Sequence, residues 1–373
     1  MKSILVVGIA QATFMAALLV GKKGRSIAVI LLFFWLLVMA AIQFYYLCIF
    51  YSLIPIPETV FVYWSVLPLL ASPLYFLYVK SITGYGINWK KAGLHLLPVG
   101  VLIAALVWLE LAQHEIHLES GFVMSHTAPW FGYYYGYLYA IVPIVYITWS
   151  LILVHRFKKH LLHNQSTISP FEMKWLEIWV AAALVSFLLS FPAVYLAAHY
   201  QLFELSLSYK LVGLLNTIYI FALSYFGFRK TSLFTDLAIR DTETTNTKTY
   251  EKSGLATYEM ARIANKMTDH LKQQKPYLNP HLTLRDLSEA LDLSTHHLSQ
   301  MLNQHLHISF YKLINQHRVN EAKERIKSGN YAHQTLLSIG LDAGFNSKAT
   351  FNKAFKEITG HTPVAFQKKN ERK

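Results

Sequence analysis

The chain has 373 residues, of which 54% are hydrophobic and 15% charged, and its formal net charge is +13 at pH 7. It is too apolar for an ordinary soluble protein, yet too charged in places for a uniform membrane protein, so two dissimilar parts joined near Arg229 are expected. The single cysteine, Cys48, lies in an apolar run and excludes an intrachain disulfide.

The first part of the chain is a succession of apolar runs, most of them close to the roughly 20 residues that a helix needs to cross a bilayer. We count seven such runs, at Ile4–Val20, Ile27–Leu53, Val60–Val79, Leu94–Leu109, Phe131–Val154, Leu176–Ala198 and Tyr209–Phe228. The sequence therefore predicts an all-α polytopic bundle of seven transmembrane helices over residues 1–229.

The connections between these runs alternate in charge. The first, third and fifth are basic, as is the segment after the seventh run, whereas the second, fourth and sixth contain no Lys or Arg. The positive-inside rule then places the N-terminus outside and the C-terminus in the cytoplasm of a bacterial cell, with the protein in the cytoplasmic membrane. Ala10, Gln11 and Ala12 also resemble a signal-peptide cleavage site, but the apolar run continues through Val20, and cleavage would leave the C-terminal part outside.

Two features of the first part suggest a sensor, and each has a plainer interpretation. The segment Trp130–Tyr139 (WFGYYYGYLY) could line a pocket for an apolar or aromatic signal molecule, or form an ordinary aromatic belt at the membrane interface. Glu110, His114 and His117 would share one face if the fourth helix continued outward, with His126 on the same loop. They could bind a metal or sense acid pH, or be common surface histidines.

We expect no metal site, no cofactor and no enzymatic activity. The sequence contains no nucleophile elbow, phosphate-binding glycine-rich loop or HExxH motif, and the histidine spacing matches no tight ligand motif.

Residues 230–275 are expected to connect the two parts. Thr231–Lys252 is threonine-rich and has no apolar period, so it is interpreted as a flexible tether. A helix should follow at Leu255–Gln274. Its apolar seam could pair two chains as a short coiled coil or pack on the domain that follows, and it consists of Met260, Ala264, Met267 and Leu271.

Residues 276–373 contain the same helix, turn, helix plan twice. In the first copy, Leu282–His305, Thr283 and Asp286 have the spacing of a capping box, and Ser294 can cap the second helix. The segment Phe310–Lys327 should form one unbroken helix of roughly 27 Å between the two copies.

The second copy, Leu336–Pro363, is marked by Gly344, where the first helix needs a left-handed residue to end, and by Ser347 as the next N-cap. The buried face of its second helix recurs at helical spacing and consists of Phe351, Ala354, Phe355 and Ile358. The opposite face is polar and basic, as reading of a DNA major groove requires. From Lys230 onward there are 21 Lys and Arg against 14 Asp and Glu, a net charge of +7, which fits DNA phosphates better than anionic lipid once the repeat is considered.

These residues resemble the AraC/XylS type of transcription regulator, whose DNA-binding domain holds two helix-turn-helix units joined by a long helix. GFNSKATFNKAFKEITGHTP is similar to the signature of that family, and NQHRVNEAKERI looks like its linker helix. The resemblance covers about Pro276 to Lys369. It implies base contacts from the outward faces of both recognition helices, which here are Thr295, His296, Ser299, Gln300, Lys348, Ala349, Asn352 and Lys353.

Two residues depart from the pattern of the family. His307 stands where a glycine is usual, and we expect only a mild backbone strain there because His tolerates the left-handed region better than most residues. Gln367 stands where an arginine is frequent, which removes one phosphate contact. Other phosphate contacts are expected from Lys356, Arg318 and the helix N-termini near Ser294 and Ser347.

The sequence thus predicts a membrane-integral, sequence-specific transcription regulator that senses a signal at or across the membrane. Its expected partners are double-stranded promoter DNA, the lipid bilayer, a small-molecule signal, a second copy of the chain and, for an activator, RNA polymerase. One alternative is a membrane transporter or enzyme whose DNA-binding tail regulates its own expression. Another is a tether from which proteolysis within Thr231–Lys252 releases the DNA-binding domain.

Overall fold

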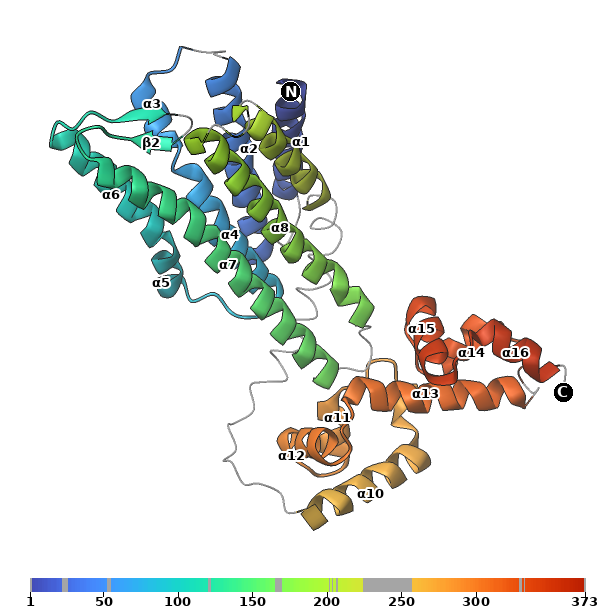
Figure 1. The fold of residues 1–373 in the computed structure, drawn as a ribbon. Helices are drawn as coiled ribbons and strands as arrows, with labels where there is room; N and C mark the ends of the chain where they lie inside the picture. Colours follow the sequence, from blue (N-terminus) through green and yellow to red (C-terminus); the bar gives the residue numbers. More distant parts are fainter. Residues whose placement is uncertain are drawn as a thin grey trace. The chain divides into compact units, whose positions relative to one another are not determined.

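The computed structural model describes residues 2–21, 26–51, 55–119, 122–164, 170–200, 202, 204–205, 207–223, 257–328, 331 and 333–371 (Figure 1). The chain divides into two compact units, residues 1–155 with 176–243 and residues 156–175 with 244–373. We call the described helices before residue 224 the apolar unit, which keeps α7 and α8 whole although residues 156–175 belong to the second compact unit, and we call residues 257–371 the C-terminal unit. The tether predicted at Thr231–Lys252 lies outside the described residues.

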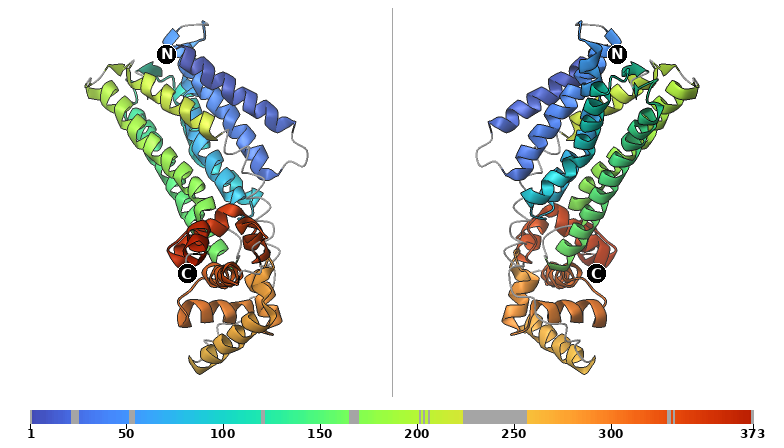
Figure 2. Two further views of the ribbon diagram at one scale, coloured as in Figure 1. Left: turned by 90° about the vertical axis from the view of Figure 1, so that its right-hand side faces the viewer. Right: turned by 90° about the vertical axis from the view of Figure 1, so that its left-hand side faces the viewer.

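The apolar unit is built from helices that run roughly antiparallel (Figures 1 and 2). They are α1 (Lys2–Val20), α2 (Ile27–Tyr51), α3 (Glu58–Trp64), α4 (Leu67–Ile82), α5 (Trp89–Ala92), η1 (Gly93–Leu96), α6 (Leu97–Leu111), α7 (Pro129–Asn164), α8 (Pro170–Tyr200) and a helix over Leu207–Leu223.

Six segments among the described residues are long and apolar enough to cross a membrane, judged by length and composition. They are Lys2–Val20, Ile27–Ile49, Glu58–Ile82, Trp89–Leu111, Pro129–Asn164 and Leu176–Ala198. The helix over Leu207–Leu223 is apolar but shorter, and the rest of the predicted seventh run lies outside the described residues. The all-α class is confirmed, while the count of seven crossings stays a prediction.

A buried amide ties the helix over Leu207–Leu223 to the rest of the apolar unit. The side chain of Gln43 on α2 is fully buried, and its Nε2 donates to Thr217 Oγ1 at 3.0 Å. The Thr217 hydroxyl also lies 3.4 Å from the carbonyl oxygen of Ile4 on α1. A buried polar group costs free energy unless it is hydrogen-bonded, so the bond from Gln43 to Thr217 favours this packing of α2 against the helix over Leu207–Leu223.

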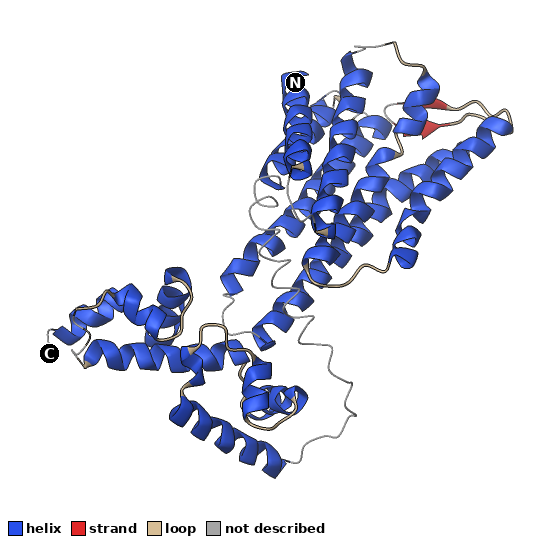
Figure 3. Cartoon of the chain, turned by 180° about the vertical axis from the view of Figure 1, so that it is seen from behind, coloured by secondary structure: helices blue, strands red, loops and turns tan. Residues whose placement is uncertain are grey.

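The outer connection after α6 does not continue as a helix, which was the condition for placing Glu110, His114 and His117 on one face. The chain turns at Gln113, where φ is 55°, and then forms an antiparallel hairpin of β1 (His117–Glu119) and β2 (Phe122–Met124). Figure 3 shows this hairpin as the place where strands occur in the described chain. Glu110, His114 and His117 therefore do not share a helical face, and the described residues contain no group of three or more His, Cys, Asp or Glu placed to hold a metal.

The C-terminal unit consists of two helices of 18 residues, α10 and α13, and several shorter ones (Figure 1). These are α10 (Thr257–Gln274), η2 (Pro276–Leu278), α11 (Leu284–Ala290), α12 (Thr295–Gln300), η3 (Met301–His305), α13 (Phe310–Lys327), α14 (Leu336–Asp342), α15 (Lys348–Thr359) and α16 (Pro363–Glu371). The predicted linker helix is confirmed at the same two boundary residues as α13.

Two hydrophobic cores share α13. Phe310 and Ile314, at its start, pack with α10, α11 and α12, whereas Val319 and Ala322, further along, pack with α14 and α15. One rigid helix thus carries both helix-turn-helix units, and the burial of both cores holds them on it.

The seam of α10 packs within its own chain. Met267 and Leu271 are buried in the first core, together with Ala264 and the partly buried Met260. These side chains are therefore occupied, which favours intrachain packing over a coiled coil between two copies. The helix also belongs with the C-terminal unit rather than with the tether.

Candidate nucleic-acid interface

The first helix-turn-helix unit forms as its capping residues predict. Asp286 N–H donates to Thr283 Oγ1 at 3.2 Å, and Thr283 N–H donates to Asp286 Oδ2 at 2.9 Å, which completes the capping box before α11. Ser294 caps α12 by accepting a hydrogen bond from the backbone of His297 at 3.1 Å. The chain then passes from α12 into a π-helical turn, η3, which the sequence did not predict.

The outward face of α12 is only partly accessible. Thr295 and His296 are exposed, whereas Ser299 and Gln300 are half-buried. The hydroxyl of Thr295 lies 3.2 Å from that of Ser288, and Gln300 Nε2 donates to Gln304 Oε1 at 3.0 Å. This bond uses one of the two N–H donors of the Gln300 amide, so the other donor remains for a base edge.

The second unit is fixed by a glycine turn. Gly344 has φ +95°, and a Cβ built there would lie 2.2 Å from the carbonyl oxygen of Tyr277. Ser347 then caps α15 by accepting from the backbone of Thr350 at 3.2 Å. Only glycine combines the left-handed conformation with this close approach, so the predicted role of Gly344 is confirmed.

The buried face of α15 is aromatic. The ring of Phe351 lies 5.2 Å from that of Phe345 and 5.6 Å from that of Phe355. On the opposite face Lys348, Ala349 and Asn352 are exposed. Lys353 is partly buried, and its Nζ lies 3.7 Å from Glu357 Oε1, one turn further along the helix. This face can offer donors to base edges.

Arg318 lies inside the unit rather than at its surface. Its side chain is 1% exposed, and it donates from Nε to Tyr277 O at 2.8 Å and from Nη2 to Asn279 O at 2.9 Å. Burial lowers the pKa of Arg318 to about 10, which still leaves it charged at neutral pH. A guanidinium held by internal carbonyls does not reach a phosphate, so we correct the prediction and remove Arg318 from the phosphate contacts.

The position of Arg318 could have been found from helical spacing. Phe310, Ile314, Arg318 and Ala322 follow one another at intervals of four residues and are all buried, so the arginine lies on the apolar stripe of α13. Its cation also lies 5.9 Å from the centroid of the Phe345 ring, within cation–π range. Arg318 therefore links the lead-in to the first unit with the turn of the second.

A second group of polar contacts joins α13 to the residues before the first helix-turn-helix unit. Glu321 on α13 accepts from Lys275 Nζ at 2.9 Å and from Arg325 Nε at 3.1 Å. Burial alone would raise the pKa of this carboxyl, but the hydrogen bonds from Lys275 and Arg325 outweigh it and lower the pKa. The hydroxyl of Tyr277 also donates to Glu321 at 3.2 Å. Sequence reasoning missed this cluster because its members are far apart in the chain.

The remaining predicted residues lie at the surface or near it. Lys356 is exposed on α15, where it can approach a phosphate. His307 has φ 50°, so the expected left-handed conformation is confirmed. Gln367 is half-buried on α16.

Comparisons with known proteins agree with this geometry. Residues 287–369 match the family described as "Helix-turn-helix domain", whose type is that of AraC. The C-terminal part of this chain carries an AraC-type helix-turn-helix domain. A DNA-binding role in transcription regulation follows for this domain.

Two relatives show how far the similarity extends. A regulator of Staphylococcus aureus (strain COL), named as an HTH-type transcriptional regulator, is 32% identical over 103 residues, or 26% of this chain and 13% of its own length. The raffinose operon transcriptional regulatory protein RafR of Pediococcus pentosaceus is 31% identical over 86 residues, or 23% of this chain and 30% of its own length. The chain thus spans well under half the length of these relatives.

Among solved structures, the C-terminal domain of AraT, a response regulator from Geobacillus stearothermophilus, is similar with 27% identity and a TM-score of 0.25. The similarity covers 31% of this chain and 88% of that one.

Proposed function

We propose that this protein is a membrane-integral, sequence-specific transcription regulator that binds promoter DNA from the cytoplasmic face of a bacterial membrane. One observation carries the proposal. Two helix-turn-helix units share the rigid α13, and the described residues of the same chain also include six segments long and apolar enough to cross a bilayer. A DNA-reading domain in such a chain needs to face the compartment that contains DNA.

The distribution of charge supports this orientation. Lys80 lies in the last turn of α4, Lys90 and Lys91 lie on α5, and Arg156 and Lys158 lie toward the end of α7. Positive residues of this kind remain on the cytoplasmic side of membrane helices. The described α7 and α8 have 36 and 31 residues, longer than the roughly 20 that cross a bilayer, so their basic ends would extend into the cytoplasm.

Base reading falls to the exposed and half-exposed residues of the two recognition helices. These are Thr295, His296, Ser299, Gln300, Lys348, Ala349, Asn352 and Lys353. The spacing between α12 and α15 is set by α13, whose 18 residues span roughly 27 Å. That length suits two helices that enter successive major grooves on one face of DNA, which recur about every 34 Å.

Phosphate contacts would come from Lys356 and from the backbone N–H groups that open α12 and α15 after Ser294 and Ser347. Such contacts release counterions, so we expect affinity to fall steeply with salt. Both serine hydroxyls act as caps here, so they would position the backbone donors rather than contact the phosphate themselves.

Selection of binding sites from random duplexes tests the DNA-binding part of the proposal. Full-length protein should enrich one motif with two half-sites about one helical turn apart. A variant with Asn352→Ala and Lys353→Ala should lose enrichment at one half-site only. Recovery of random sequence by the unaltered protein at low salt would contradict the proposal.

A topology experiment tests the membrane part. A reporter active only in the cytoplasm, fused after Lys373, should be active, and the protein should remain in membranes after alkaline washing. Activity of a reporter that works only outside the cell would contradict the orientation.

A further inference from the structure

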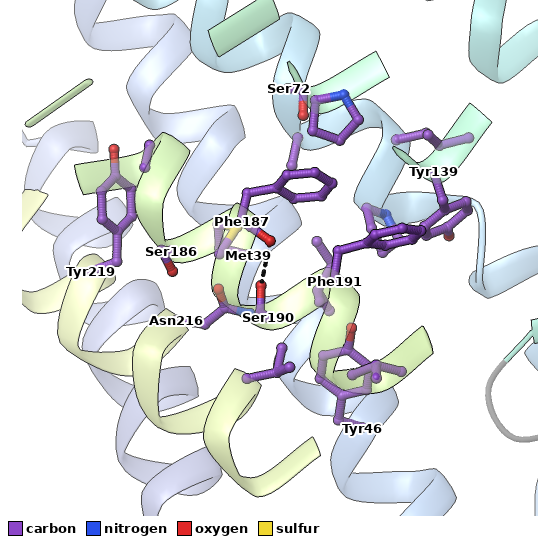
Figure 4. Close-up of a pocket in the computed structure, with 18 of the residues that line it drawn as sticks. Met39, Tyr46, Ser72, Tyr139, Ser186, Phe187, Ser190, Phe191, Asn216 and Tyr219 are labelled. Atoms are coloured by element: carbon purple, nitrogen blue, oxygen red, sulfur yellow. Dashed lines mark hydrogen bonds between the residues drawn. The ribbon is translucent and has the colours of Figure 1, made fainter. Parts of the chain in front are cut away.

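The apolar unit contains a partly open cavity of about 220 Å³ between α2, α4, α7, α8 and the helix over Leu207–Leu223. Figure 4 shows side chains from all five elements around it, among them Met39, Ser72, Tyr139, Ser190 and Asn216. A cavity of about 150 Å³ already accepts a benzene ring, so this one has room for a two-ring molecule.

The lining of the cavity selects for an uncharged ligand. The described residues around it include seven tyrosines, four serines and one asparagine, and none is acidic, basic or histidine. A charged ligand would move from water into an apolar site that offers no opposite charge, which costs free energy. A neutral ring can instead contact the aromatic faces and use the hydroxyl groups for hydrogen bonds.

Tyr45 indicates where such a bond would form. Its side chain is 3% exposed and lines the cavity, and its Oη has no hydrogen-bond partner among the described residues. Other tyrosines around the cavity are satisfied: Tyr135 donates to Ser65 Oγ at 2.8 Å, and Tyr219 donates to Tyr75 Oη at 3.0 Å. An unpaired buried hydroxyl costs roughly 1–3 kcal/mol, so an acceptor placed beside Tyr45 would relieve that cost.

The cavity lies where an external molecule could reach it. Tyr45 and Ser65 are close to the ends of α2 and α3, and Phe122, which also lines the cavity, is on the hairpin strand β2. These positions border the connections without Lys or Arg, which the proposed orientation places outside. Pro143 lines the cavity within α7, and Pro192 interrupts α8, so both long helices lack a backbone hydrogen bond near it.

We propose that this cavity binds a neutral, two-ring aromatic molecule whose carbonyl or hydroxyl oxygen accepts a hydrogen bond from Tyr45. That this molecule is the signal for transcription regulation rests on the proposed function. The binding itself does not. Binding itself can be measured without DNA.

Three probes of nearly equal size separate the contributions of shape, hydrogen bonding and charge. They are 2-acetylnaphthalene, 2-ethylnaphthalene and 2-naphthoate. Full-length protein in lipid nanodiscs is dialysed against each probe, with empty nanodiscs as the control for partition into lipid. We expect saturable binding of 2-acetylnaphthalene, roughly fivefold weaker binding of 2-ethylnaphthalene from the loss of one neutral hydrogen bond, and no saturable binding of 2-naphthoate.

Variants locate the site. Tyr45→Phe should bring the affinities of the acetyl and ethyl probes together without lowering thermal stability, because the hydroxyl has no internal partner to lose. Tyr137→Phe, at a tyrosine on α7 that is 62% exposed and away from the cavity, should retain the fivefold preference. Ser190→Phe should fill the cavity and abolish saturable binding of both neutral probes.

The proposal is overturned by equal affinity of the unaltered protein for the acetyl and ethyl probes, by an unchanged preference in Tyr45→Phe, or by absence of saturable binding. DNA affinity, measured on the same preparations, separates the two proposals. Intact DNA binding without probe binding would overturn the cavity site alone, whereas probe binding without DNA affinity would support the cavity site and overturn the proposed function.

Discussion

The two units of this protein place polar and apolar residues in opposite ways. In the apolar unit, Leu111, Ile178 and Leu189 are at least 60% exposed, while Gln43 and Thr217 are buried. In the C-terminal unit the aromatic rings of the second core are buried, and the exposed face of α15 is polar and basic. This inversion is expected when one unit folds in lipid and the other in water, because each turns outward the residues that suit its solvent.

The helices themselves show the same contrast. α10 and α15 are strongly amphipathic, with one apolar and one polar face, whereas α1 and α2 are apolar on all sides. The buried face of an amphipathic helix can be predicted from the sequence alone, whereas that of a uniformly apolar helix cannot. The C-terminal unit can therefore be interpreted residue by residue from its sequence, and the apolar unit cannot. The predictions below test this contrast, from the largest expected effect to the smallest.

Gly344→Ala should produce the largest loss of stability, because it places a methyl group at the tightest backbone contact of the C-terminal unit. Strain at φ +95° and the approach to Tyr277 O together predict a loss of about 4 kcal/mol in the free energy of unfolding of the C-terminal unit. Hydrogen exchange of residues 257–371 in the full chain measures it. Gly360→Ala is the matched control: φ is +76° but no atom lies within 4 Å, so about 1 kcal/mol is expected.

Leu189→Arg tests the outward apolar surface. Leu189 is 60% exposed within the segment Leu176–Ala198, and an arginine near the centre of a crossing helix costs about 3.5 kcal/mol relative to leucine. Membrane insertion, measured with a glycosylation reporter, should fall sharply. Val364→Arg, at a site 53% exposed on α16, should change stability by less than about 0.5 kcal/mol. If arginine were tolerated equally at Leu189 and Val364, the two units would not differ in the residues they expose.

Arg318→Met and Lys356→Ala separate an internal cation from a surface one. Removal of Arg318 takes away the donor to Tyr277 O and one of the two donors to Asn279 O, which still accepts from the Leu282 N–H at 3.2 Å. Stability should therefore fall by about 3 kcal/mol while the salt dependence of DNA binding stays the same. Lys356→Ala should reduce the slope of log affinity against log salt by about 0.9, with unfolding unchanged. If Arg318→Met instead reduced the salt dependence and left unfolding unchanged, Arg318 would be a phosphate contact after all.

Lys353→Ala should cost about 2 kcal/mol of DNA binding and relax the preference at one base position. Competition between duplexes that differ at that position measures the change. Glu357→Gln removes the ion pair with Lys353 but leaves the lysine in place, so it should retain the preference. An unaltered preference in Lys353→Ala would remove that residue from the reading face.

Acid should weaken the C-terminal unit through His317, and this is the smallest effect. Burial lowers the pKa of His317, as does nearby Lys272, so the unfolded chain takes up a proton more readily than the folded unit. Stability is therefore full above about pH 6.5, the unfolded value, and falls as the pH drops below it. His317→Asn should flatten the pH dependence of unfolding between pH 7 and pH 5, and an unchanged profile would exclude His317 as its source.

Much of the C-terminal unit could be predicted because local signals in it agree. Thr283, Ser294 and Ser347 each mark a helix start through a side-chain oxygen that caps it, and Gly344 marks a helix end through its left-handed backbone. The structure confirms all four. The role of Arg318 was missed because residue type suggested a surface cation, although its spacing from Ile314 places it on the buried stripe. Burial follows from packing, and packing depends on residues far apart in the sequence.

The apolar unit was predictable in composition but not in detail. Hydropathy found the apolar segments, but not the break between α3 and α4 or the hairpin in the connection that follows α6. The cavity combines residues from five elements, so no single segment contains its signal. The aromatic run Trp130–Tyr139 supplied part of its wall, namely Tyr135 and Tyr139, while Tyr45 depends on tertiary contacts.

Footprinting of DNA by the full-length protein in lipid nanodiscs tests the central claim most directly, because it requires membrane insertion and groove reading in one molecule. We predict two protected major-groove segments on the same face of the duplex, about one helical turn apart, on the sequence selected from random duplexes. No protection at low salt by protein that is demonstrably embedded in the nanodisc would contradict the account.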